Sequence, residues 1–203
     1  MDELNEQDLF RVRFRFLDLI KSFFVEEPDA ETMSRWRGTF SALAKEQVSP
    51  RFDIGVKEIS RALSDRTLKE LQEEYYEVFV NPFDTGMVET TASYYLNGRS
   101  FDQALVDIRG LMIEAGIQKD ETVTDPEDSL VVMLDTFASL LEVEKISGGE
   151  KIRQLQRMML ENFLEPFTEK FTATLKENKH ADFYYLCCLV LSGYLDLEKS
   201  LVT

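Results

Sequence analysis

Few side chains in this sequence have the types and spacing that acid–base, nucleophilic or metal chemistry requires. The single histidine, His180, lies in the polar stretch ENKHAD, which is typical of a solvated turn. The two cysteines, Cys187 and Cys188, are adjacent and lie in an apolar stretch, which indicates small buried side chains rather than redox work. A di-iron bundle needs two Glu-x-x-His motifs, which a single histidine cannot supply, and one histidine with two adjacent cysteines does not suit zinc. We therefore predict no catalytic residue and no bound metal.

Phosphate-binding patterns are also missing from the sequence, which contains neither G-x-x-x-x-G-K-[ST] nor G-x-G-x-x-G. The stretch Gly148-Gly149-Glu150-Lys151 opens a helix and could hold an anion, but two glycines are ordinary between helices. Carboxylate pairs such as Glu26-Glu27 and Glu73-Glu74 are typical of solvated faces. We predict no cofactor and a protein that binds rather than catalyses. A nucleotide hydrolase is the enzymatic alternative.

The stretch from Tyr75 to Arg99, YYEVFVNPFDTGMVETTASYYLNGR, is the best candidate for binding. It begins as the end of a helix, breaks at Asn81-Pro82, and brings a second aromatic cluster at Tyr94-Tyr95. Proline disfavours helical geometry at the residue before it, so the pattern predicts an irregular segment. Ordered irregular segments on helical scaffolds often carry binding residues. The alternative is a loop that its aromatic residues merely anchor.

The charge of the chain favours some partners and disfavours others. There are 38 acidic and 23 basic residues, a net charge of −15. This charge argues against nucleic acid and anionic membranes and favours basic partners, although an acidic surface also serves solubility. The N-terminus is acidic where a secretory signal would be basic, and no uncharged apolar run is long enough to span a membrane. We expect a cytoplasmic protein with reduced thiols and no stable membrane insertion.

Apolar residues at helical spacing predict an all-α fold, a single helical bundle of about eight to ten helices. Trp36 lies on such a stripe and is expected in the core. Polar residues interrupt the pattern at 117–124, so we predict an N-terminal lobe (about 1–116), a hinge (about 117–128) and a C-terminal lobe (about 129–203). Local signals predict helix starts at Thr67 with Glu70, at Ser100 with Gln103 and at Asp125 followed by Pro126. Gly148-Gly149 separates the next helix, Pro166 kinks or restarts it, and the last helix begins at about Asp182.

Three motifs then resemble the TorD/DmsD/NarJ family of cytoplasmic chaperones for molybdoenzyme maturation. A helix ends in aromatic-x-x-apolar-Phe (75–79), a loop continues into Ser-aromatic-aromatic-Leu-x-Gly-Arg (93–99), and Pro-Glu-Asp (126–128) opens a later helix. The resemblance covers nearly the whole chain in length and helix order. It implies that the family's binding residues fall on Tyr75, Val78, Phe79, Ser93, Tyr94, Tyr95, Arg99, Glu127, Asp128 and Ser129.

The sequence departs from the family pattern at two places. Ser129 stands where many members have histidine, and Thr90-Thr91 stand where some have Pro-Trp. The first departure concerns any role that the family gives to that histidine, including nucleotide binding. The second indicates a different groove and a different client.

The resemblance implies a function without catalysis. The chaperone would bind the twin-arginine signal peptide, or its N-terminal remnant, on the catalytic subunit of a molybdopterin oxidoreductase, and would delay export until the cofactor is inserted. Arginine forms bidentate contacts with carboxylates, so Glu127 and Asp128 are expected to pair with the peptide's arginines, with a plain helix cap as the alternative for Asp128. The family implies a monomer, or a dimer that swaps domains through residues 117–124. The competing hypothesis is a helical adaptor for a different folded partner.

Overall fold

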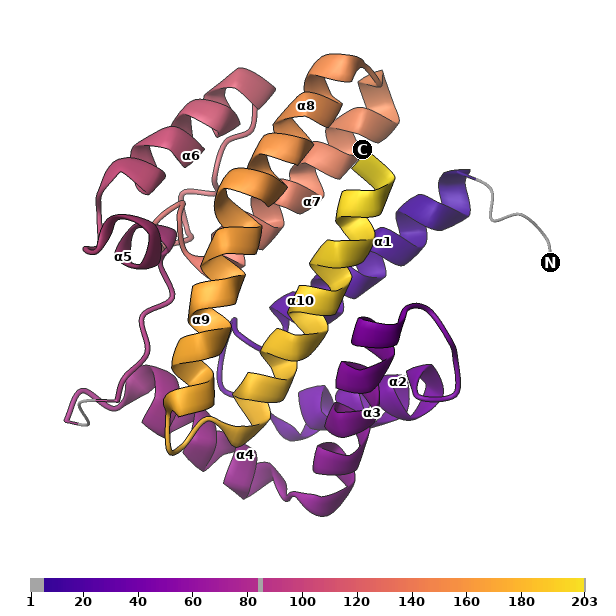
Figure 1. Cartoon of the computed structure of the whole chain (residues 1–203), viewed down its shortest axis with the longest axis vertical. Helices are drawn as coiled ribbons and strands as arrows, with labels where there is room; N and C mark the ends of the chain where they lie inside the picture. Colours follow the sequence, from indigo (N-terminus) through magenta and orange to yellow (C-terminus); the bar gives the residue numbers. More distant parts are fainter. Residues whose placement is uncertain (1–5, 84–85, 203) are drawn as a thin grey trace. The chain divides into compact units, whose positions relative to one another are not determined.

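Helices make up the regular structure in this computed structural model, which describes residues 6–83 and 86–202. The α-helices are α1 (Glu6–Lys21), α2 (Ala30–Leu43), α3 (Pro50–Asp65), α4 (Leu68–Tyr75), α5 (Ala92–Asn97), α6 (Gln103–Ala115), α7 (Leu130–Ser147), α8 (Glu150–Met159), α9 (Glu165–Glu177) and α10 (Asp182–Val202) (Figure 1). Two π-helical segments, η1 (Tyr76–Val80) and η2 (Leu160–Leu164), continue α4 and α8. Within the described ranges no β-strand is formed, and an isolated antiparallel bridge joins Thr91 to Ser129. The all-α prediction is confirmed.

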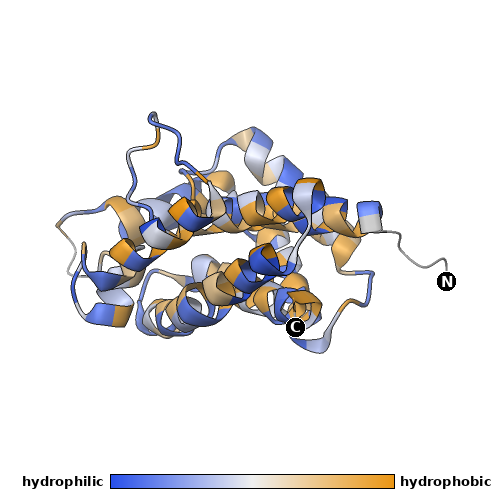
Figure 2. Ribbon diagram, turned by 90° about the horizontal axis from the view of Figure 1, so that it is seen from above, coloured by the Kyte–Doolittle hydropathy of each residue, from blue (hydrophilic) through white to orange (hydrophobic). Residues whose placement is uncertain are grey.

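Contacts between residues divide the chain into two compact units, and segments of the two units alternate along the sequence. Unit 1 takes the chain up to Lys21, then Thr90–Phe167, and then the residues from Lys199 on. Unit 2 takes Ser22–Glu89 and Thr168–Glu198. The predicted hinge at 117–128 lies inside unit 1, and its role as a hinge stays a prediction. Hydrophobic and hydrophilic residues share the same helices, as the amphipathic pattern predicted (Figure 2).

Aromatic side chains form the core of unit 2. The Trp36 side chain has no exposed surface, and its ring centroid lies 4.9 Å from that of Phe23. Its indole N–H donates to Ser22 Oγ at 2.8 Å, so the buried polar atom is satisfied. Helices α3 and α10 approach closely in this unit, because a Cβ atom on Gly193 would lie 2.7 Å from the Cα atom of Phe52. Glycine is required at position 193 for this packing.

A polar cluster joins three helices in unit 1, where α1 and α8 each pack on α7 and α6 packs on α8. Glu144 of α7 accepts from Arg153 Nε at 2.9 Å and from Gln156 Nε2 at 2.9 Å, and it lies 3.9 Å from an Arg13 nitrogen. Burial raises the pKa of Glu144, but these hydrogen bonds and positive charges outweigh burial and leave it below its ordinary value. The cluster therefore holds an ionised carboxylate.

The predicted start of α7 is wrong. The helix begins at Leu130, and its N-cap is Ser129, whose side chain accepts from the Val132 N–H. Neither Asp125 nor Asp128 caps α7. The reason is a tertiary contact: the N–H of Ala92 donates to the Asp128 carbonyl at 2.7 Å, and the N–H of Leu130 donates to the Thr90 carbonyl at 2.9 Å. This pairing keeps the backbone around Asp128 and Ser129 out of helical geometry.

The predicted start of α6 is also wrong. Its N-cap is Asp102, whose side chain accepts from the Gln103 N–H, so Ser100 does not begin the helix. Phe101, which the start at Ser100 would place in the first turn of the helix, instead precedes it with φ +60° and is 74 % exposed. Asn97 Oδ1 accepts from the Ala104 N–H at 2.9 Å and satisfies a second free donor of the first turn.

Two further segments refine the sequence predictions. The irregular segment expected over 75–99 contains the short helix α5 and, at its start, the π-helical segment η1. Around Pro166 the helices α8, η2 and α9 follow one another directly, and the π-helical turn ends at Leu164, two residues before the proline. A π-turn widens the helix, which accommodates a residue that cannot donate its own N–H.

Candidate functional site

The two motif segments of unit 1 meet at a buried carboxylate. Asp128 Oδ2 accepts from the Ser93 N–H at 2.9 Å and also from the Ser93 hydroxyl. Neither side chain has any exposed surface, and Ser129 beside them is buried. The second oxygen, Oδ1, has no hydrogen-bond partner among the described residues. The contact fixes the first turn of α5 against the chain that leads into α7.

Accessible side chains surround this contact. Tyr94 is 44 % exposed, and its ring centroid lies 5.1 Å from that of Tyr95. Tyr95 is half-buried and packs edge-on against Phe167 at 5.3 Å. Arg99 is exposed and forms an ion pair with Asp102. Of the residues predicted on this segment, Tyr94 and Arg99 offer the most surface to a ligand.

Glu127 is partly exposed and paired within unit 1. It accepts from Arg109 of α6, from Nε at 3.0 Å and from a terminal guanidinium nitrogen at 2.8 Å. Partial burial raises the pKa of Glu127, but the hydrogen bond and charge of Arg109 outweigh it and leave the pKa below its ordinary value. A hollow of about 520 Å³ lies beside this pair, between α6 and the loop 117–123. The carboxylate is therefore ionised and reachable from one side.

Three of the predicted binding residues belong to unit 2, namely Tyr75, Val78 and Phe79. The other predicted binding residues belong to unit 1. Phe79 packs at 4.9 Å from the ring centroid of Tyr184, and Tyr75 at 5.8 Å from the same ring. Val78 has no exposed surface. In this conformation Val78, Ser93 and Asp128 would have to become exposed to touch a peptide. Their assignment to a binding site stays a prediction.

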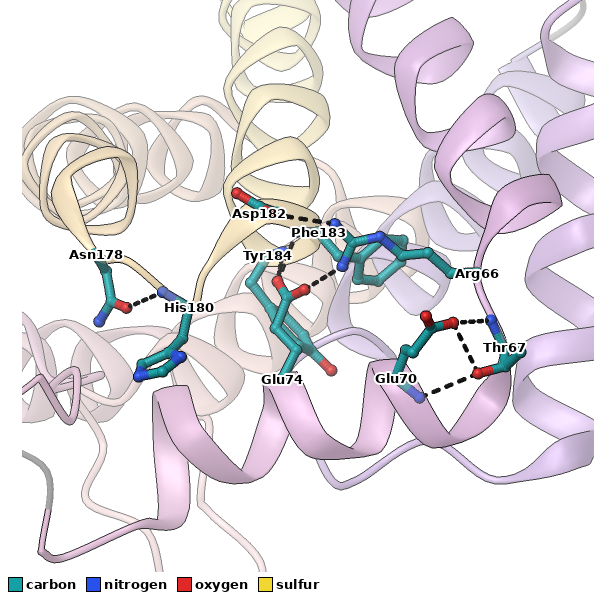
Figure 3. Close-up of polar contacts among 9 residues, drawn as sticks. All are labelled: Arg66, Thr67, Glu70, Glu74, Asn178, His180, Asp182, Phe183 and Tyr184. Atoms are coloured by element: carbon teal, nitrogen blue, oxygen red, sulfur yellow. Dashed lines mark hydrogen bonds and ion pairs between the residues drawn. The ribbon is translucent and has the colours of Figure 1, made fainter.

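Glu74 is a polar centre that the sequence interpretation missed. The pair Glu73-Glu74 is typical of a solvated face, but Glu74 is buried, 6 % exposed. Its Oε1 accepts from the backbone N–H groups of Phe183 at 2.5 Å and Tyr184 at 3.0 Å, at the start of α10 (Figure 3). Its other oxygen pairs with Arg66, which also reaches Asp182 at 3.4 Å. A glutamate of α4 therefore serves as the cap of α10, a relation between residues more than a hundred positions apart that no local pattern reveals.

Burial has the largest effect on the pKa values of the ionisable groups around Glu74. It raises the pKa of Glu74, although the two N–H groups and Arg66 act in the opposite direction. It also raises the pKa of the Tyr184 hydroxyl and of both thiols, Cys187 and Cys188, so neither thiol is activated as a nucleophile. His180 is half-buried rather than freely solvated, and its backbone N–H donates to Asn178 Oδ1 at 2.9 Å (Figure 3).

The described ranges show two general features that bear on function. They contain no group of three or more histidine, cysteine, aspartate or glutamate side chains arranged to hold a metal ion. None of the helices in these ranges combines the length and apolar character that crossing a membrane requires. The arrangement supplies hydrogen bonds, ion pairs and apolar contacts, which are the elements of a binding surface.

Comparisons with known proteins agree with the fold and with the family resemblance. The family model described as nitrate reductase delta subunit matches residues 45–173. The chaperone protein TorD of Vibrio parahaemolyticus serotype O3:K6 (strain RIMD 2210633) is 26 % identical over an alignment of 163 residues that covers 76 % of this chain and 75 % of that protein. A crystal structure from Archaeoglobus fulgidus, described as a redox enzyme maturation protein, shares the fold with a TM-score of 0.60 at 17 % identity, over 91 % of this chain and 94 % of that one. The family model covers more than half of the sequence. The chain therefore belongs to the nitrate reductase delta subunit family, the TorD/NarJ family of non-catalytic chaperones for redox enzyme maturation.

Proposed function

We propose that this chaperone binds the twin-arginine signal peptide, or its N-terminal remnant, on the catalytic subunit of a molybdopterin oxidoreductase in the cytoplasm. It masks the peptide and delays export until the cofactor is inserted. The observation that carries the proposal is the family match over residues 45–173, which includes both motif segments, 75–99 and 125–129. Neither catalysis nor a cofactor of the chaperone's own takes part.

The chemistry of the chain supports this partner. A twin-arginine peptide joins two guanidinium groups to an apolar stretch, and a net charge of −15 attracts such a ligand over long range. Glu127 is ionised and reachable, and Tyr94 presents an exposed ring. Carboxylates bind arginine through charge-assisted hydrogen bonds, and aromatic rings contact the apolar stretch.

An affinity capture tests the proposal. The tagged protein is expressed in its native host under anaerobic growth, and the captured proteins are identified by mass spectrometry. We expect a molybdoenzyme catalytic subunit, and we expect its capture to be lost when both signal arginines are replaced by lysine, because lysine cannot form the bidentate contact. A captured partner that ignores this replacement would instead support the adaptor hypothesis.

A further inference from the structure

The carboxylate of Glu127 is paired with an arginine of its own chain. Arg109 Nε donates to Glu127 Oε2 at 3.0 Å, and a terminal nitrogen of the same guanidinium group lies 2.8 Å from this oxygen. Two nitrogens of one guanidinium group thus contact one carboxylate, which a lysine ammonium group cannot reproduce. The contact is of the same kind as the one proposed above for an arginine of the client.

The two members of this pair differ in their exposure to solvent. The Glu127 side chain is 17 % exposed, whereas the Arg109 side chain is 53 % exposed. When the pair opens, the guanidinium group is readily hydrated, but the partly buried carboxylate still requires a positive charge. Arg109 is therefore the member that another cation can replace.

The backbone that carries Glu127 is held in place on its C-terminal side. The carbonyl of Pro126 accepts from the Ser129 N–H at 3.0 Å, and the carbonyl of Asp128 accepts from the Ala92 N–H at 2.7 Å. The carboxylate therefore stays in position when its partner is exchanged.

The hollow of about 520 Å³ beside the pair gives an incoming side chain access to it. Both members of the pair line this hollow, together with apolar residues such as Ile113, which is 78 % exposed. Lys119 also lines it, but its ammonium group donates to the carbonyl of Asp125. A cation that enters from solvent thus competes with Arg109 for Glu127.

We propose that Arg109 is an internal competitor, which occupies the place of the client's arginine on Glu127 until the signal peptide binds. The inference rests on the proposed function and adds a regulation of its site. On binding, a guanidinium group of the peptide takes over Oε2 of Glu127, and the side chain of Arg109 turns into solvent. The competition weakens every ligand that uses Glu127 by the same factor. A tightly binding signal peptide tolerates this loss, whereas an arbitrary basic segment is kept off the site.

Removal of the competitor tests the proposal. The probes are fluorescein-labelled synthetic signal peptides, one for each molybdopterin oxidoreductase catalytic subunit of the native host, titrated with the full chain and followed by fluorescence anisotropy. Arg109→Ala is expected to tighten binding about fivefold, the factor that corresponds to an ion pair of about 1 kcal/mol. The matched control is Arg11→Ala, which removes the same charge from an exposed ion pair with Asp8 on α1 of unit 1. It is expected to change the affinity by less than about twofold, because salt screens distant exposed charges.

A double-mutant cycle tests whether the effect acts through Glu127. In the background of Glu127→Gln, Arg109→Ala is expected to lose most of its fivefold gain, because the carboxylate for which the two arginines compete is gone. An equal gain in both backgrounds would show that Arg109 acts through its charge alone and would overturn the inference.

Nuclear magnetic resonance follows the exchange of partners directly. In the full chain labelled with ¹⁵N-arginine, the Arg109 Nε–H is expected to exchange with water faster once unlabelled peptide saturates the site, since its bond to Glu127 is lost. If the wild-type chain binds a peptide, loses it when both arginines become glutamine, and gains nothing from Arg109→Ala, the competitor is wrong and the proposed function stands. An Arg109 Nε–H signal that saturation leaves unchanged would have the same meaning. If the wild-type chain binds none of the signal peptides, the proposed function fails and this inference fails with it.

Discussion

Asp128 acts as a structural tie in the described conformation, since its Oδ2 accepts from both the N–H and the hydroxyl of Ser93. We predict that Asp128→Ala lowers the free energy of unfolding by about 2–3 kcal/mol, because the buried donors of Ser93 lose their acceptor. Urea denaturation measures the change. The control is Arg99→Ala, which removes an exposed ion pair and is expected to change stability by less than about 1 kcal/mol. Equal unfolding midpoints for the two variants would contradict the tie.

The buried carboxylate of Glu74 predicts a pH dependence. Its pKa is raised in the folded chain above the ordinary 4.5, so the folded state binds a proton more tightly than the unfolded state. Stability from this group is therefore greatest below about pH 4.5 and is lost as the pH rises through the folded pKa. We expect the stability of the wild-type chain relative to Glu74→Gln to fall as the pH rises from 4.5 through the raised pKa of Glu74, measured by denaturant titrations. A difference that is constant or rises over this range would refute the assignment.

At the scale of the helix, local signals succeed where the partners are local. Thr67 and Glu70 were predicted as a capping box, and both hydrogen bonds are present. The start of α7 was misplaced because Asp125 and Pro126 are good local signals, whereas the pairing of Asp128 with the segment around Ala92 decides the outcome. Sequence spacing carries no information about that contact, nor about Glu74 at the start of α10.

The N-caps of α4 and α7, Thr67 and Ser129, are expected to contribute different amounts to the free energy of unfolding. Thr67 accepts from Glu70 N at 3.3 Å while the Glu70 carboxylate accepts from the Thr67 N–H at 2.7 Å and from its hydroxyl at 2.8 Å. Ser129 makes one long bond to the Val132 N–H at 3.4 Å. We expect Thr67→Ala to cost about 1–2 kcal/mol and Ser129→Ala about 0.5 kcal/mol. Thermal unfolding of both variants measures this order, and a larger loss for Ser129→Ala would show that this serine does more than cap.

Close packing of α3 and α10 gives a further prediction. A methyl group on Gly193 would meet the backbone of Phe52, so Gly193→Ala must push two helices apart. We expect it to destabilise the chain by about 2–3 kcal/mol, in the range of overpacked cores. Gly38→Ala, which meets nothing within 4 Å, is the control and is expected to stabilise α2 by about 0.5–1 kcal/mol. The same sign for both substitutions in calorimetry would show that the close approach is not a constraint.

For the whole molecule, apolar periodicity was enough to predict the class of fold, because each helix carries its own pattern. Apolar periodicity could not predict that segments of the two units alternate along the sequence, because this division depends on which helices contact one another. The same limit applies to the candidate site. The motif residues could be named from the sequence, yet the burial of Ser93 and Asp128 follows from their mutual contact.

The net charge of −15 predicts how a client arrives. The electrostatic attraction between an acidic protein and a basic peptide speeds their association, and salt screens this attraction. The Debye length falls from about 30 Å at 0.01 M salt to about 3 Å at 1 M. We expect the association rate constant for a twin-arginine signal peptide, measured by stopped-flow fluorescence, to fall about tenfold or more across this range. The control peptide replaces both arginines with glutamine and is expected to lose most of the salt dependence. Because salt does not screen apolar contacts, the dissociation rate constant is expected to change less. A salt effect on dissociation alone would show that the charges act in the bound complex and not during the approach of the peptide.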